Sequence, residues 1–293
     1  MKRILVKQGP STLTISVPKD WVKRCGLKNG NEVELEEIDT KLLLSSSKKT
    51  ETKCVEFDFS GINDSMIREI VIAMYKVGLK DIKINNLNEK QIKKIKEIIL
   101  NCAGLEIIDS SRYSLKILDI GLADEETINK AETQIYWKLL NLLEKVIEKA
   151  GSKEQIYNLD TEINRLAFFI QRNLSSRFSS STETFLRYEK ISILEELGDS
   201  IRRYNKHSKK TSDEIKILKE ITKLIEEFRV FESKKDISLL FELKKKIESV
   251  ESKIKINEKK PDISKVFIKE IINRIKSLHE NLIASNIKFM QLS

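Results

Sequence analysis

The sequence predicts a multidomain α+β protein: a small β-rich module at residues 1–48, an α/β unit at 52–120 and an all-helical region at 123–293. Three observations lead to this expectation. Short runs of alternating apolar residues fill the first segment, two strand-then-helix patterns fill the second, and apolar residues at helical spacing continue through the third. With only nine glycines and three prolines in 293 residues, the chain has the composition of a folded, helix-rich protein.

The β-rich module begins with a strand, a turn at Gly9–Thr12 and a second strand. Pro18 then opens a short helix that ends at Cys25–Leu27, and a second hairpin carrying Asn29–Gly30 follows. A compact module of this kind in front of a long helical region suggests a recognition module attached to a sensory domain.

Basic residues gather in the first part of this module, whereas acidic residues gather between Glu32 and Asp39. A one-sided basic surface suits a polyanion, because it can displace the counterions of phosphates. The alternative is a solvated hairpin with ordinary surface lysines. The candidate residues for contacting duplex DNA are Lys2, Arg3, Lys7, Ser11, Thr12, Lys19, Lys23 and Arg24.

Four features of residues 3–44 occur together: a basic first strand, a Gly-x-Ser loop at Gly9–Ser11, the segment ISVPKDWVKRCGLKNGNEVEL at 15–35 and a final aliphatic strand. In this combination the module resembles the swapped-hairpin domain of the AbrB, MazE and SpoVT proteins. In that family two chains interleave their hairpins into one barrel, so the resemblance implies a homodimer. A module of this size also buries little core alone, which favours dimerisation independently.

Residues 52–120 are expected to form a βαβαββ unit. Val55–Phe59 alternates like a strand, a helix capped at Asn63 ends at Gly78, and the pattern repeats from Asp81 to Gly104 before a final hairpin. Neither helix begins with a glycine-rich phosphate loop, so no nucleotide site is expected. The expected roles of this unit are spacing, dimer contact or signal relay.

From Asp124 onward the pattern is almost wholly helical, and five breaks divide it into six predicted helices. The breaks lie near residues 151–152, 179–181, 211–213, 233–236 and 261–262. The helix lengths and short connections favour antiparallel neighbours, hence two three-helix bundles packed together, at 123–208 and 211–293.

Three carboxylates of the helical region are predicted to converge. Glu195 and Asp199 lie four residues apart on one face of a helix, and Asp160 lies on the preceding helix. Such a set can share a divalent metal ion, which is the one candidate cofactor of the chain. The alternatives are a solvated acidic surface, or neutralisation by an arginine such as Arg165 or Arg202.

Two helical segments, LDTEINRLAFFIQRNL at 159–174 and ILEELGDSIRRYNK at 193–206, resemble helices of the PhoU family of phosphate-uptake regulators. The order of the three parts resembles archaeal PhoU-like proteins with an AbrB-type front end. In some family members these helices carry the E(D)xxxD segments that bind metal clusters. Here Asn164 stands where the motif has Asp, so a neutral ligand replaces an anionic one, which disfavours a multinuclear cluster. The second half of the helical region has no recognisable ExxxD segment, so the resemblance implies at most one metal site.

No catalytic constellation is found, and an enzyme is not expected. The two histidines, His207 and His279, stand in no motif that activates a nucleophile or binds zinc. Cys25, Cys54 and Cys102 are odd in number and far apart, which indicates small buried side chains in a reducing compartment. Since no apolar run is long enough for a bilayer, membrane insertion is not expected and the expected location is cytoplasmic.

Taken together, these patterns predict a dimeric DNA-binding transcriptional regulator of phosphate uptake, with a PhoU-like helical domain that senses a ligand or binds a partner. The alternative is a signalling adaptor that docks on a phosphate transporter or a sensor kinase and uses the N-terminal module only to dimerise. The placement of the basic side chains separates the two hypotheses, because a basic face on the dimer favours DNA.

Overall fold

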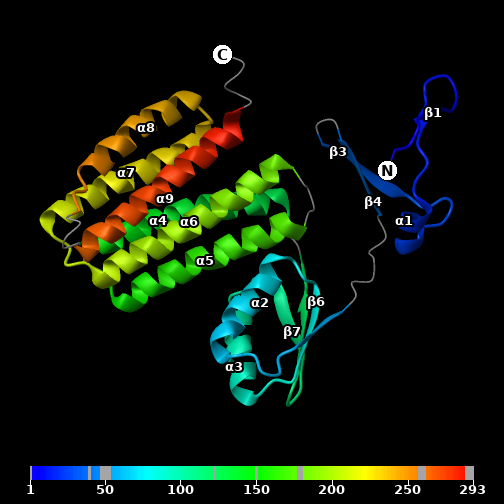
Figure 1. Cartoon of the computed structure of the whole chain (residues 1–293), viewed down its shortest axis with the longest axis horizontal. Helices are drawn as coiled ribbons and strands as arrows, with labels where there is room; N and C mark the ends of the chain where they lie inside the picture. The colour runs from blue at the N-terminus through cyan, green and yellow to red at the C-terminus, as the bar shows by residue number, and fades with distance from the viewer. Residues whose placement is uncertain are drawn as a thin grey trace. The chain divides into compact units, whose positions relative to one another are not determined.

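A computed structural model of the chain describes residues 2–38, 41–46, 54–121, 123–148, 151–176, 181–256 and 262–287. The chain divides into two compact units, Met1–Cys54 and Val55–Ser293 (Figure 1). The β-rich module forms the first unit. The α/β layer and the helices, which the sequence assigns to separate domains, lie together in the second.

The first unit contains two hairpins and one short helix. Strands β1 (Val6–Lys7) and β2 (Leu13–Thr14) pair antiparallel, helix α1 (Lys19–Arg24) follows, and β3 (Val33–Ile38) pairs antiparallel with β4 (Lys41–Ser46). This is the predicted order of elements. Within the described part of one chain the hairpins are separate two-stranded sheets and do not close into a barrel.

The pair Asn29–Gly30 lies in the turn between α1 and β3. Gly30 has a φ of +82°, which glycine adopts at little cost, and Asn31 Oδ1 accepts a hydrogen bond from Lys28 N at 2.8 Å. The pair therefore leads into the second hairpin and is not part of it, contrary to the prediction. The turn of that hairpin, at 39–40, is outside the described residues.

The second unit begins with a four-stranded sheet that carries two helices on one face (Figure 1). The strand order is β5-β6-β8-β7, with β5 parallel to β6 and the other neighbours antiparallel. Buried residues alternate along β6 and β8, as expected for a sheet with one covered face. The elements follow the predicted βαβαββ order: β5 (Val55–Asp58), α2 (Ile67–Lys76), β6 (Asp81–Asn85), α3 (Glu89–Ile99), β7 (Leu105–Ser110) and β8 (Leu115–Asp119).

Local sequence signals explain the ends of both helices in this layer. Helix α3 begins with a capping box, in which Asn88 Oδ1 accepts from Gln91 N at 2.9 Å and Gln91 Oε1 accepts from Asn88 N at 3.0 Å. Helix α2 ends at Gly78, which has a φ of +78°. The amide of Leu79 then bonds back to Met74 O, so the last carbonyls of α2 are partly satisfied by the turn itself.

Six helices follow in the described part of the chain, separated at the predicted breaks. They are α4 (Glu125–Glu148), α5 (Lys153–Ser176), α6 (Thr182–His207), α7 (Ser212–Lys234), α8 (Ile237–Ser252) and α9 (Ile263–Asn286). The first three pack on one another, as do the last three, and the two groups join where α6 packs on α9 and α4 on α7. None of the described helices is long and apolar enough to cross a membrane.

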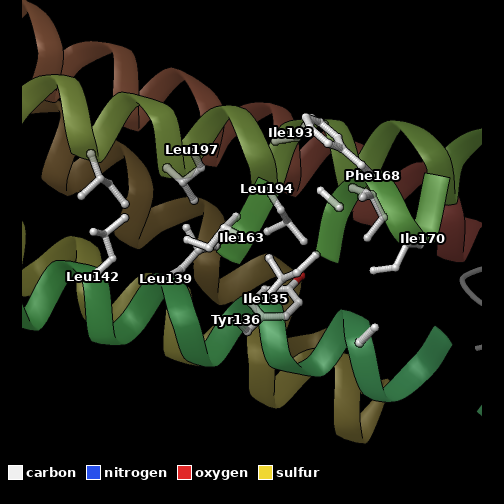
Figure 2. Close-up of a cluster of buried hydrophobic side chains, with 14 of the residues drawn as sticks. Ile135, Tyr136, Leu139, Leu142, Ile163, Phe168, Ile170, Ile193, Leu194 and Leu197 are labelled. Atoms are coloured by element: carbon white, nitrogen blue, oxygen red, sulfur yellow. The ribbon is translucent and has the colours of Figure 1, made fainter. Parts of the chain in front are cut away.

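The core of the first helical group is built from interlocking aliphatic side chains (Figure 2). Leu139 of α4, Ile163 of α5 and Leu194 of α6 are completely buried. Gly198 of α6 permits this close approach, because a Cβ at that position would lie 3.3 Å from Ile163 Cδ1. Packing of this density holds the polar side chains of α5 and α6 in fixed positions.

Arg172 of α5 joins the helices to the α/β layer. Its side chain is 1% exposed and forms an ion pair with Asp119 of β8, at 2.5 Å between Nη2 and Oδ2. The guanidinium also donates to Tyr75 O at 3.0 Å and to Leu79 O at 3.3 Å, so it closes the C-terminal turn of α2. These bonds link the α/β layer to the helices within the second unit.

Candidate functional site

The described residues of the first unit form no core of their own. None of the side chains described within residues 2–46 is buried. Instead, its strands and the segments beside them expose large apolar side chains. The most exposed are Ile4 (83%), Leu42 (63%), Leu13 (61%) and Leu35 (61%). Exposed apolar surface of this extent in so short a segment marks an interaction surface.

The predicted DNA-contacting residues fall into two sets in this unit. Lys19, Lys23 and Arg24 lie on α1, where the four-residue spacing of the lysines places them on one face. The other set lies on or beside the first hairpin, whose turn is closed by a hydrogen bond from Gln8 N to Thr12 O at 2.8 Å. Its members are Lys2, Arg3, Lys7, Ser11 and Thr12.

All eight of these side chains are exposed, and the basic ones form no ion pair with another described residue. Apart from Asp20 of α1, the described acidic residues of the module lie elsewhere, at Glu32 and on β3. Lysines and arginines without carboxylate partners keep their full charge available to an external anion.

Residues 6–52 match the MazE family. The family is described as antidote-toxin recognition MazE, bacterial antitoxin. The matched segment begins with β1 and includes both hairpins, in agreement with the swapped-hairpin resemblance of the sequence. Comparison with curated proteins and with solved structures gave no match. The family match does not extend beyond residue 52, so the resemblance of the helices to PhoU stays a prediction.

The second unit brings the three predicted carboxylates to one place. Asp160 of α5 and Asp199 of α6 are bridged by Arg202: its Nε lies 2.8 Å from Asp160 Oδ2, and its Nη2 donates to Asp199 Oδ1 at 2.9 Å. Glu195 lines the same cavity one turn earlier on α6. Glu162, which also lies on α5, is not part of this cluster, because it pairs with Lys138 of α4 at 2.5 Å.

Burial dominates the electrostatics of this cluster. It raises the pKa of Asp160 to about 7; Arg202 opposes the shift and the neighbouring Asp199 adds to it. Burial also raises the pKa of Glu195, against the favourable charges of Lys76 and Arg68 on α2. The carboxylates are therefore only partly compensated by the positive charges around them.

The arrangement does not fit a resident metal ion. A guanidinium already binds Asp160 and Asp199, and within the described ranges no group of three or more carboxylate, histidine or cysteine side chains is placed to hold a metal. The neutraliser is Arg202, one of the two arginines that the sequence offered. Asn164, which stands where the PhoU motif has Asp, has an Oδ1 atom that is buried without a hydrogen-bond partner.

The cluster forms part of a cavity of about 430 Å³ between the α/β layer and the helices. Helices α2, α3, α5 and α6 supply its walls. The charged and polar side chains of the lining are Arg68, Lys94, Glu97, Asn101, Tyr157, Asp160, Thr161, Asn164, Arg165, Glu195, Asp199 and Arg202.

The structure also contains a buried ion network that the sequence did not predict. Lys190 of α6 is 8% exposed and lies between two glutamates, with Nζ 3.1 Å from Glu132 Oε2 on α4 and 2.8 Å from Glu232 Oε1 on α7. The network lines a cavity of about 950 Å³. The sequence signal that could have revealed it is the helical spacing of Lys190 with Ile193, Leu194 and Leu197, which places a lysine on the apolar face of α6.

The histidines and cysteines take no part in either cluster. His279 is buried, with Nε2 2.8 Å from Leu240 O, and His207 stacks on Phe267. None of the three cysteines forms a disulfide bond within the described residues. The expectation of buried side chains holds for Cys102 and is wrong for Cys54, which is exposed; Cys25 is half-buried.

Proposed function

We propose that the protein is a dimeric DNA-binding transcriptional regulator whose helical unit senses a ligand or binds a partner. One observation on the first unit carries this proposal. None of its described side chains is buried, yet basic residues without ion pairs and large apolar residues are exposed together. The match of residues 6–52 to the MazE family is consistent with this role.

The lack of buried side chains among the described residues of the first unit supports dimerisation. About 25 cal/mol is gained for each Å² of apolar surface removed from water. In one chain Leu35 and Leu42 of the second hairpin stay more than 60% exposed. A second copy that pairs its hairpins with these would supply the absent core, as in the interleaved barrel that the sequence resemblance implies.

Duplex DNA is the ligand that the charges favour. The unpaired cations of the first hairpin and of α1 can bind phosphates, and the hydroxyls of Ser11 and Thr12 lie in an exposed turn between Lys7 and α1. The binding of such a surface decreases steeply with salt, because it releases counterions.

Regulation of phosphate uptake is the finer form of this proposal. Its support is the resemblance of segments 159–174 and 193–206 to PhoU helices. Under the adaptor alternative, the helical unit docks on a phosphate transporter or a sensor kinase and the first unit only dimerises. The exposed basic side chains favour DNA binding over this alternative.

An antitoxin is a second candidate, supported by the description of the matched family. The exposed apolar strands of the first unit would then cover a toxin protein. A toxin complex and a DNA complex differ in salt dependence, since the toxin contact is apolar and the DNA contact is ionic.

Mobility-shift titrations with genomic DNA fragments at about 50 and 200 mM salt test the proposal. We expect binding that weakens with salt. Lys19→Ala with Lys23→Ala should lower the affinity and flatten the log-log salt slope by about one unit per lost phosphate contact. The control is Lys244→Ala with Lys245→Ala on α8, which should leave both unchanged. A dimer that binds no fragment at either salt concentration contradicts the proposal and favours the adaptor.

A further inference from the structure

The cavity between the α/β layer and the helices has hydrogen-bond acceptors on its floor that no described donor uses. Asp160 is 3% exposed; Arg202 binds its Oδ2, but no donor reaches its Oδ1. Asn164 Oδ1 is also buried and accepts no hydrogen bond. Glu195, on the facing helix, forms no hydrogen bond or ion pair within the described residues. Buried acceptors of this kind favour a ligand that donates hydrogen bonds and carries positive charge.

The mouth of the same cavity carries the opposite charge. Arg68 of α2 and Arg165 of α5 line it, are exposed, and have no hydrogen bond or ion pair within the described residues. Glu97 and Lys94 of α3 line the same cavity. Two guanidinium groups without an ion pair on the lining of one cavity favour an anionic group, which arginine binds with two parallel hydrogen bonds.

We propose that this cavity binds a small zwitterion of the α-amino acid class, with its ammonium group at Asp160, Asn164 and Glu195 and its carboxylate at Arg68 and Arg165. A molecule of this class matches both ends of the cavity, whereas an anion or a cation alone matches one. The volume of about 430 Å³ lies within the range of small-ligand sites. Because Arg68 belongs to the α/β layer and Arg165 to α5, the bound ligand joins the two parts of the second unit.

The raised pKa of Asp160 is consistent with this assignment. The charged groups around it are Arg202, Asp199 and Glu195 on α6, Arg165 on α5, Lys76 and Arg68 on α2, and Lys94 and Glu97 on α3. An ammonium group at the floor adds one positive charge, so it lowers the pKa of Asp160 and releases a proton on binding near neutral pH. Affinity for the zwitterion therefore increases as the pH rises through about 7.

In the larger cavity, at Lys190, the central charged side chains have ion-pair partners. Lys190 is bound by Glu132 and Glu232, and Arg187 is bound by Glu125 and Glu132. Its charged side chains neutralise one another, so they call for no charged ligand.

The test uses the full chain and each standard amino acid at millimolar concentration. Thermal melts identify those that stabilise the protein, and titration calorimetry gives their affinity. We expect at least one amino acid to raise the melting temperature. Asp160→Asn and Arg165→Met should each weaken its binding by about tenfold or more, the loss of a charge-assisted contact. Glu162→Gln is the matched control, because it lies on the same helix, pairs with Lys138 and should bind normally.

Three results would overturn the proposal. The first is that no amino acid stabilises the chain. The second is binding that is unchanged in Arg165→Met, an exposed substitution that leaves the fold intact and so decides the matter even if Asp160→Asn does not fold. The third is stabilisation by manganese alone, lost in Asp160→Asn, which would make the floor a metal site. Loss of DNA binding leaves the proposal untouched, since it does not depend on the first unit.

Discussion

Arg172 and Asp119 form an ion pair in which the two side chains are 1% and 4% exposed. Arg172 comes from the C-terminal end of α5, and Asp119 is the last residue of β8. The pair therefore ties together segments that the sequence assigns to separate domains.

Removing one partner of this pair should destabilise the second unit strongly. Asp119→Asn leaves a buried guanidinium without its counter-ion, for which we expect a loss of about 3–5 kcal/mol in the free energy of unfolding. Urea denaturation measures the loss. Asp213→Asn, which breaks the exposed pair with Lys216, is the control and should cost less than about 1 kcal/mol. Equal effects of the two variants would show that the buried pair is not required.

Gly78→Ala should destabilise the protein for two separable reasons. The residue has a φ of +78°, and an added Cβ would overlap Ser176 Oγ of α5. Gly61 has nearly the same φ, +77°, with nothing within 4 Å, so Gly61→Ala isolates the backbone strain of about 1–2 kcal/mol. We expect Gly78→Ala to cost more in denaturation, and Ser176→Ala to rescue part of the loss. If Ser176→Ala restores no stability, the structure adjusts around residue 78 and the overlap with Ser176 Oγ is not the cause of the loss.

The stability of the protein should decrease between about pH 4 and pH 7 because of Asp160. Its pKa is raised from 3.8 to about 7 on folding, so the folded state holds a proton that the unfolded chain releases, and rising pH favours unfolding. Asp160→Asn should flatten this dependence in urea titrations at several pH values. Glu195 has a raised pKa too, so part of the slope should remain. A variant with the wild-type slope would contradict the assignment.

Arg202→Met should make the carboxylate cluster dependent on added cations. Without the guanidinium, Asp160, Asp199 and Glu195 repel one another, so the melting temperature should fall in the presence of a chelator. Manganese or magnesium should restore more stability to this variant than to the wild type. Elemental analysis of the wild type purified without chelator is the companion measurement. Stoichiometric metal in the wild type would show that Arg202 leaves the carboxylates.

Leu35→Lys should convert the proposed dimer to a monomer and abolish the proposed DNA binding. The substitution places a charge on the apolar surface of the second hairpin, which the second copy is proposed to cover. Sedimentation velocity of the full chain gives the oligomeric state. Leu100→Lys, a similarly exposed position after α3, is the control and should leave the dimer intact. If the Leu35→Lys protein is still a dimer, the subunit contact does not depend on this hairpin.

Much of the fold was predictable because its signals are local. The cap at Asn88, the left-handed turn at Gly78 and the breaks between the helices each depend on a few neighbouring residues. The βαβαββ order follows from the same signals. Asn29–Gly30 misled the prediction, because a turn dipeptide marks a turn without stating which elements it joins.

The candidate sites were predictable only in part. Convergence of Asp160 with Asp199 followed from helix periodicity and antiparallel packing, and the sequence offered Arg202 as a neutraliser. The contributions of Arg68 and Lys76 depend on how α2 packs against α5, which no spacing in the sequence records. For the same reason Arg172 was overlooked: its partner Asp119 lies 53 residues away, and only its place among buried residues of α5 hints at a role.

The strand order of the sheet also constrains how the protein is made. Strand β8 lies between β6 and β7, although it is the last of the three in the chain. A nascent chain that has not yet released Leu115–Asp119 from the ribosome therefore exposes an unpaired edge on both older strands. The same strand ends in Asp119, the acceptor of Arg172, so the ion pair that links α5 to the α/β layer cannot form before β8 is in place. Synthesis thus passes through an interval in which the sheet lacks this inner strand, and this interval ends with the arrival of five residues.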